Sequence, residues 1–323
     1  MRYGGVAQPS PEEPYQGPPV EAWDAAPLIA VHRNSLPGES SSAGGPMPRG
    51  RERRSFCRSG KGSPVTAPAL QGVVEGAAAR VSGRLGCCVC PETGTPWAIH
   101  RAEETFATAS VIKAPIAVAV AAEVEAGRLE WNQLLPPHLR DDAGDSGVIR
   151  HLSPLPYTVR DLVFLMLVVS DNRATNLLVD LVGMERLNAS FARAGWERTS
   201  LARRLGDFEA RARGLENRST PRETCDVFLR LLRGDLLSPG SRTLLLEFLK
   251  AQVYRDRLPA RLPRTTAVAH KTGDMPGVEN DAGVLYLPAG PIVAAVFTNE
   301  LASDVEGRLA IQEIGRAIYD AGR

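Results

Sequence analysis

Segments with the pattern of β-strands stand near the two ends of the apolar part of this chain, with a long run of helical pattern between them. Residues 86–90 and 95–100 predict a strand pair around a turn. Residues 267–272, 283–287 and 292–298 predict three more strands, whose short links favour antiparallel pairing. We therefore expect the two groups to build one sheet, although most of the chain separates them.

Apolar residues recur at helical spacing through the middle of the chain. A run that begins at Ser110 ends at Gly127, and five segments follow at 158–169, 171–182, 184–194, 221–233 and 239–252. Helices are also expected at 67–84 and 303–320. This order predicts an α+β fold, with a sheet part (about 65–109 and 264–323) layered with helices and an all-helical part (about 110–263). A cleft between the two parts is where a substrate site belongs.

The first 64 residues differ from the rest in composition. They are rich in Pro, Gly, Ser and Arg and show no sustained apolar period, so they cannot bury enough surface to offset the entropy of ordering. We expect residues 1–64 to be a disordered extension and residues 65–323 to be the catalytic domain. The basic run at 49–54 could tether nucleic acid or a membrane, but a solvated tail, or a start codon chosen too far upstream, is the favoured interpretation.

Charge and hydropathy exclude several classes of partner. The formal net charge of the 323 residues is +1, which gives no reason to expect nucleic acid or a membrane surface. The sequence has no apolar run long enough for a transmembrane helix, and its N-terminus lacks the apolar region of a secretory signal. As written, the sequence predicts a cytoplasmic monomer acting on a small molecule. Export is expected only if the start is wrong.

The five cysteines do not have the pattern of an exported disulfide framework. The cysteines are Cys57, Cys87, Cys88, Cys90 and Cys225. Their number is odd, and three of them lie within the four positions 87–90. Cys87 and Cys90 form a Cys-x-x-Cys pair, but no second pair follows at zinc spacing. Buried thiols in a strand are therefore favoured over a metal or redox site, with Cys88 and Cys90 on one sheet face.

Ser110 and Lys113 are the first candidates for chemistry. A spacing of three residues places both side chains on one face of a helix, in its first turn, where unsatisfied N–H groups favour a developing oxyanion. A desolvated lysine can serve as the base that a serine needs to become a nucleophile. On its own this spacing is common, and most examples are a helix cap followed by a surface lysine.

Two further motifs follow in order. Ser170-Asp171-Asn172 lies between two helical segments and could be only a helix cap, while Lys271-Thr272-Gly273 ends a strand and could be only a turn. Together with Ser110-x-x-Lys113, they form the signature set of class A β-lactamases and penicillin-binding proteins. From about residue 66 to the C-terminus the chain resembles this family. The resemblance implies a five-stranded antiparallel sheet flanked by helices, plus an all-α domain.

The same resemblance implies a role for each motif residue. Ser110 would attack a carbonyl carbon, Lys113 would tune or accept its proton, Ser170 would pass a proton to the leaving nitrogen, and Lys271 would supply positive potential. The residues expected to contact substrate are Asn172, Thr272, Gly273 and Asp274, with the backbone N–H groups of Ser110 and Asp274 as the oxyanion hole. Asp171 would hold its loop and His270 would be structural. No metal or organic cofactor is implied.

The sequence departs from the family pattern in the long charged stretch from Arg198 to Thr220. Class A enzymes carry a deacylating Glu there in a Glu-x-x-Leu-Asn context, which is missing. The nearest carboxylates are Asp207 and Glu209, and each could instead pair with nearby arginines. A second departure is the acidic run at 279–281, where class A enzymes commonly place an Arg for the substrate carboxylate.

These observations predict a serine β-lactamase-type hydrolase that opens a cyclic amide through an acyl-enzyme on Ser110. Two alternatives follow from the missing Glu motif. One is a related amide or ester hydrolase, or a peptidase acting on D-amino-acid peptides. The other is a protein that binds β-lactams covalently without turnover.

Overall fold

The computed structural model describes residues 67–136, 144 and 146–323. The expected extension at 1–64, its basic run and Cys57 lie outside the described residues. All described residues belong to one compact unit of the chain, Gly60–Arg323.

The strands from the two ends of this unit form one antiparallel sheet of five strands, as the sequence predicts. In the order β2-β1-β9-β8-β7, they are β2 (Ala98–His100), β1 (Arg84–Pro91), β9 (Gly290–Asn299), β8 (Val278–Leu287) and β7 (Val268–Met275). The two groups join where β1 pairs with β9, with Cys88 opposite Ala295. Strand β8 begins five residues before the predicted start at 283, because the polar run Glu279-Asn280-Asp281 is buried strand.

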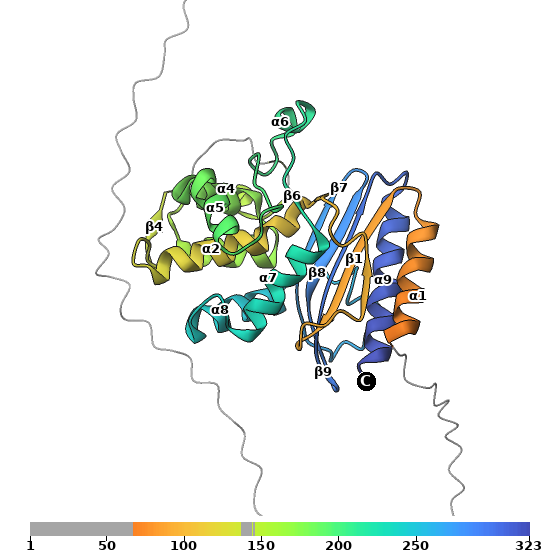
Figure 1. Cartoon of the computed structure of the whole chain (residues 1–323). Coiled ribbons are helices and arrows are strands. Elements are labelled where there is room, and N and C mark those ends of the chain that lie inside the picture. Colours follow the sequence, from red (N-terminus) through yellow and green to blue (C-terminus); the bar gives the residue numbers. More distant parts are fainter. Residues whose placement is uncertain (1–66, 137–143, 145) are drawn as a thin grey trace, which may run out of the picture. The chain divides into compact units, whose positions relative to one another are not determined.

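Helices cover both faces of the sheet (Figure 1). Helices α1 (Ala67–Arg80) and α9 (Asp304–Ala321) lie side by side on one face, and α7 (Pro221–Arg233) packs on the other. Side chains alternate between the faces, so Cys87 joins the apolar core under α1 and α9 while Cys88 and Cys90 join the core under α7. The sequence-based prediction that Cys88 and Cys90 share a face is confirmed.

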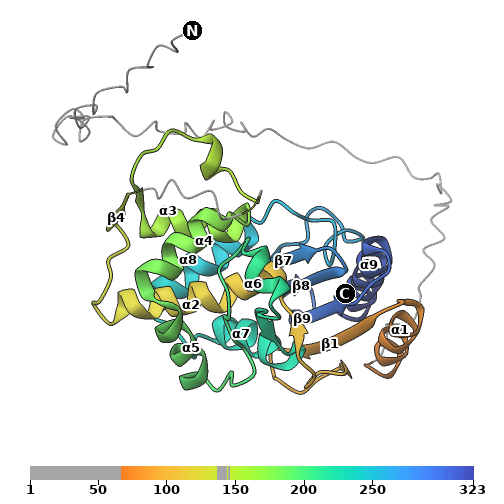
Figure 2. The same cartoon turned by 90° about the horizontal axis from the view of Figure 1, so that it is seen from above.

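The other helices form the helical part around α2, which is apolar on all sides and therefore buried. Figure 2 shows α2 among its neighbours α3, α4, α5, α7 and α8. The bounds are α2 (Lys113–Glu125), α3 (Val159–Val168), α4 (Asn172–Val182), α5 (Met184–Arg193), α6 (Phe208–Ala212) and α8 (Pro239–Lys250). None of the helices in the described ranges is both long and apolar enough to cross a bilayer.

One short helix and two pairs of short strands were not predicted from the sequence. Helix α6 has a single turn inside the long charged stretch, too short for a recognisable apolar period. Two-residue strands pair as β3 (Phe106–Ala107) with β6 (Arg218–Ser219), and as β4 (Leu134–Leu135) with β5 (Tyr157–Thr158). The pair β3–β6 joins the residues just before Ser110 to the end of the charged stretch, so these two segments lie side by side.

Candidate active site

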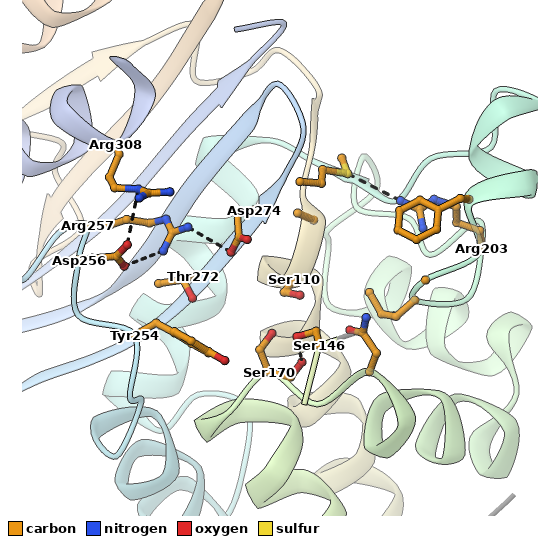
Figure 3. Close-up of a pocket in the computed structure, with 16 residues that line it drawn as sticks. Ser110, Ser146, Ser170, Arg203, Tyr254, Asp256, Arg257, Thr272, Asp274 and Arg308 are labelled. Carbon is orange, nitrogen blue, oxygen red and sulfur yellow. Dashed lines mark hydrogen bonds and ion pairs between the residues drawn. The ribbon is translucent and has the colours of Figure 1, made fainter. Parts of the chain in front are cut away.

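A cavity of about 310 Å³ lies where strand β7 faces the helical part (Figure 3). Its volume suits a small molecule. Both parts of the unit contribute to its wall, as expected from the sequence. The residues that line it include Ser110, Ser146, Ser170, Asn172, Arg203, Leu205, Phe208, Tyr254, Asp256, Arg257, Thr272, Asp274 and Arg308.

Ser110 stands between the two walls, with Thr272 on the sheet side and Ser170 on the helical side (Figure 3). It lies in a 3-10 turn, Ala109–Ile112, and the α-helix starts only at Lys113, one turn later than predicted. Ala109 and Ser170 have φ angles of 45° and 56°. Such left-handed backbone is strained for residues other than glycine and clusters at functional sites. Here the two strained residues flank the candidate nucleophile in space.

Lys113 is fully buried beneath this wall and holds the second motif in place. Its Nζ lies 2.7 Å from the backbone oxygen of Ser170, 3.0 Å from Ser170 Oγ and 2.7 Å from Asn172 Oδ1. Burial lowers the pKa of Lys113 well below that of a free lysine, and the positive charge of Lys271 lowers it further. Lys113 Nζ is the donor in all three contacts.

Asp171 holds the loop around Ser170, as predicted. Its carboxylate accepts hydrogen bonds from the backbone N–H groups of Val148, Ile149 and Ala174, the last of which caps helix α4. Ser146, which no sequence motif indicated, donates its hydroxyl to the Ser170 backbone oxygen at 2.8 Å. These bonds fix the strained Ser170 where Lys113 can reach it.

Lys271 is fully buried in β7, with its Nζ 2.8 Å from the backbone oxygen of Thr272. Burial lowers the pKa of Lys271 to about 7, against the opposing effect of the Asp274 and Asp281 carboxylates. Both protonation states are therefore populated near neutral pH. Thr272 is buried as well, yet it lines the cavity.

Gly273 lets β7 approach the turn that carries Ser110. A Cβ at Gly273 would lie 2.6 Å from the backbone oxygen of Thr108 and 2.8 Å from the backbone nitrogen of Ser110. No side chain fits there, so the motif glycine brings the strand against the nucleophile's own backbone.

Arg257 is a cavity residue that sequence reasoning missed. It comes from the link between α8 and β7 and is buried. Its guanidinium lies 3.1 Å from Asp274 Oδ1, 2.8 Å from Asp256 Oδ1 and 2.5 Å from Glu279 Oε2. No motif surrounds it, so the sequence holds no signal that separates it from the other arginines.

The residues of the acidic run at 279–281 form ion pairs and hydrogen bonds with other parts of the chain. Glu279 is ion-paired with Arg257 and Arg308, and Asp281 accepts from His270 Nδ1 and from the backbone of Leu258. The Asn280 amide bonds the backbone of Ala107. Arg257 and Arg308 thus place positive charge at the end of the cavity next to this acidic run. His270 is fully buried in this pairing, which agrees with a structural role.

The charged stretch presents Arg203, Leu205 and Phe208 to the cavity, but none of its acidic side chains. The Asn176 side chain clamps Leu205 by bonding both its N–H and its carbonyl at 2.9 Å, and Leu205 and Phe208 line the cavity. Asp207 caps α6 by accepting from the Ala210 N–H, and Glu209 is exposed. Neither is among the described residues that line the cavity, so the structure does not bring these two candidates to Ser110.

Comparisons with known proteins identify the family of this chain. The sequence model of the Beta-lactamase enzyme family matches residues 68–321. A β-lactamase of Rhodobacter capsulatus is 30% identical over 252 residues, 74% of this chain and 85% of that protein. The crystal structure of a β-lactamase from Sphaerobacter thermophilus has a TM-score of 0.73 at 33% identity and covers 80% of this chain and 97% of its own.

A second kind of neighbour is PBP-A. The structure of a leucine-to-glutamate mutant of PBP-A, an acyl-enzyme complex with penicillin G, has a TM-score of 0.72 at 30% identity. The match covers 79% of this chain and 96% of the PBP-A chain. The fold is therefore β-lactamase/transpeptidase-like, and the chain belongs to the beta-lactamase enzyme family.

Proposed function

We propose that this protein is a serine hydrolase that opens β-lactam rings through an acyl-enzyme on Ser110. The observation that carries the proposal is that Ser110 and Ser170 line one cavity with two fully buried lysines next to it. Lys113 bonds Ser170, and Lys271 directly precedes the cavity residue Thr272. Buried lysines lose protons readily and activate neighbouring hydroxyls. The names of the relatives, and the penicillin G adduct of the PBP-A mutant, support a lactam as substrate.

In the acylation step, Ser110 Oγ attacks the lactam carbonyl carbon while its proton passes to neutral Lys113. The lowered pKa of Lys113 supports this direction of transfer. Negative charge then develops on the carbonyl oxygen. The backbone N–H groups of Ser110 and Asp274 are its proposed donors, and the contact of Gly273 with the Ser110 turn supports that placement.

Breaking the C–N bond requires a proton on the departing nitrogen, and Ser170 is the proposed donor. Its hydroxyl lies 3.0 Å from Lys113 Nζ. The proton that Lys113 took from Ser110 can replace the one that Ser170 gives away, so no net charge is left on either residue. Lys271 in its charged form stabilises the electron density that moves toward the nitrogen.

Substrate recognition is proposed for the cavity residues on either side of Ser110. Asn172 is held by Lys113 and would hydrogen-bond the substrate's side-chain amide. Thr272 would bind a substrate carboxylate, with Arg257 beside it as the counter-charge. Asp274 contributes its backbone, while its carboxylate is paired with Arg257.

Deacylation is the proposed slow step. The carboxylates that line the cavity within the described residues are Asp256 and Asp274, and both are ion-paired with Arg257. Each carboxylate already accepts from the Arg257 guanidinium, so neither is the proposed base toward water. Asp207 and Glu209 remain candidates from the sequence, but each would have to turn toward the cavity to act.

The proposed catalytic unit is one domain of one chain. We take residues 65–323 as the catalytic domain, with about 65–109 and 264–323 as its sheet part and about 110–263 as its helical part. Because every proposed catalytic side chain comes from one chain, a monomer suffices.

The test is to incubate the protein with a chromogenic cephalosporin and with a penicillin, following colour and intact mass. Colour with a transient or persistent adduct on Ser110 is the expected result, and Ser110→Ala should form none. Turnover at full rate by Ser110→Ala, or neither colour nor adduct in the unaltered protein, would overturn the proposal.

A further inference from the structure

Three of the cysteines meet on the sheet face opposite α1 and α9. Cys88 and Cys90 project from β1, and Cys225 projects toward them from α7, more than a hundred residues later in the chain. Their sulfur atoms all lie within 4.8 Å of one another, and Cys88 Sγ and Cys90 Sγ are 3.6 Å apart. All three are buried. The sequence could not show this cluster, because no motif around Cys225 indicates that it lies close to Cys88 and Cys90 in the fold.

The spacing of the sulfurs suits one metal ion. Two sulfurs bound to the same ion at about 2.3 Å in tetrahedral geometry are separated by about 3.8 Å, close to the separation of Cys88 and Cys90. Thiolates are soft ligands that select Cu⁺ and Zn²⁺ over the hard cations Mg²⁺ and Ca²⁺. Among the described residues, this is the one group of three or more His, Cys, Asp or Glu side chains placed close enough to share an ion.

We propose that Cys88, Cys90 and Cys225 form a closed three-sulfur site for one thiophilic d10 metal ion, such as Cu⁺ or Zn²⁺. Each thiol that binds gives its proton to solvent as its sulfur bonds the ion, and no oxidation is involved. Such a site would staple β1 to α7 across the core, at a distance from the cavity of Ser110.

Two cationic side chains stand near the cluster. Arg222 and Arg233 of α7 are close enough to act electrostatically on Cys90, and their charges would offset the negative charge of a metal bound by three thiolates. Cys90 is the least buried of the three cysteines and lies one residue before the end of β1.

Cys87 provides a matched control. It is the strand neighbour of Cys88, equally buried, but it faces the opposite core under α1 and α9. A comparison of Cys225→Ala with Cys87→Ala therefore separates loss of a ligand from loss of a buried thiol. The parent and each variant also carry Cys57→Ser, which removes the one thiol outside the described residues.

The experiment titrates the reduced full-length chain with Cd²⁺, following the ultraviolet thiolate-to-metal charge-transfer band and native intact mass. Zn²⁺ and Cu⁺ then compete in separate arms and identify the natural ion by affinity. We expect one Cd²⁺ per chain and a rise in melting temperature. Cys225→Ala should weaken binding about tenfold or more, whereas Cys87→Ala should leave it unchanged.

Absence of a stoichiometric charge-transfer band would overturn the site, as would equal binding by Cys225→Ala and the parent. A Cys88→Ala and Cys90→Ala pair keeps the test decisive if Cys225→Ala fails to fold. The readout does not involve β-lactams, so it stands or falls independently of the proposed function.

Discussion

The wall around Ser110 and the charged stretch from Arg198 to Thr220 face the same cavity but are built differently. Lys113 at the start of α2 bonds Ser170 just ahead of α4, Lys271 in β7 bonds the backbone of Thr272, and both lysines are fully buried. The stretch is also anchored, by Asn176 to Leu205 and by an Arg203–Glu216 ion pair of 2.7 Å. Yet it brings no carboxylate to the cavity wall, where its side chains are those of Arg203, Leu205 and Phe208.

This difference separates the two halves of the reaction. In the proposed reaction, acylation depends on groups that the fold itself positions, namely Ser110, Lys113 and Ser170. Release of the acyl group would depend on a water-activating side chain from a loop position, which can change without disturbing the core. The predictions below test whether the two halves are separable.

The largest effect is expected for Ser110→Ala. Without the nucleophile there is no acyl-enzyme, and β-lactam consumption should fall by a factor of about 10⁴ or more. Stopped-flow colour change and intact mass measure the loss. Ser146→Ala is the control, since it removes a serine from the same cavity wall that serves only the Ser170 backbone. If Ser146→Ala abolished the adduct instead, the nucleophile would be misassigned.

How far the sequence alone leads can be judged from this wall. Ser110-x-x-Lys113, Ser170-Asp171-Asn172 and Lys271-Thr272-Gly273 are local patterns with fixed spacing, so they could be found without any long-range contact. The strand and helix order follows from periodicity in the same way. The five-stranded sheet and the meeting of these motifs were therefore predictable.

The rest depends on contacts that no local pattern contains. Arg257 reaches the cavity from an irregular link, and Cys225 reaches Cys88 only because α7 lies across β1. The strand at 279–281 was missed because its polar side chains find buried partners, Arg257 among them, that are distant in sequence. Polar residues are usually taken to be exposed, but residues paired in this way are buried.

Lys113→Ala should slow acylation by a factor of about 10² to 10⁴, because it removes the proposed proton acceptor and leaves Ser170 Oγ without its partner. The second-order rate of adduct formation, followed by mass, is the measurement. Lys250→Ala, which removes a lysine from α8 outside the cavity wall, is the control. An unchanged acylation rate in Lys113→Ala would show that another group accepts the proton.

Leu205→Glu sharpens the comparison by placing a carboxylate on the loop. Leu205 is held by Asn176 at the cavity wall, so a glutamate there would face the acyl-enzyme rather than solvent. We expect the adduct lifetime to shorten by a factor of about 10² while the acylation rate changes little. Burial of the new charge should cost about 1–3 kcal/mol of stability.

Leu205→Gln is the matched variant, similar in shape but unable to act as a base. Pre-steady-state bursts measure both steps in each variant. Equal adduct lifetimes for the Glu and Gln variants would mean that a carboxylate at this position is not what limits deacylation.

A smaller effect is expected from pH. Because burial lowers the pKa of Lys271 from its unfolded value to about 7, its charge is present below pH 7 and lost above it. The second-order acylation rate with an anionic β-lactam should therefore lose a factor of about 10 as the pH rises from about 6 to about 8. Lys271→Arg keeps its charge over this range and should be slower but free of this step.

Stability should respond to Lys271 in the opposite direction. The unfolded chain binds the Lys271 proton more tightly than the folded one, so the free energy of unfolding rises with pH from about 7 up to the unfolded pKa. Urea unfolding of the parent and of Lys271→Met, compared at both ends of this window, isolates the contribution of Lys271. A flat difference would show that Lys271 is charged throughout.

The smallest effects are expected at the two acids of the charged stretch. Asp207 is engaged as the cap of α6 and Glu209 is exposed, so Asp207→Asn and Glu209→Gln should each alter the adduct lifetime by less than about twofold. Asparagine still caps a helix, whereas Asp207→Ala should cost about 1 kcal/mol of stability without changing the chemistry. Mass-detected decay of a penicillin adduct, with thermal unfolding alongside, separates the two outcomes. A tenfold longer adduct lifetime in Asp207→Asn or Glu209→Gln would mean that the stretch rearranges once Ser110 is acylated, and that the carboxylate then reaches the water.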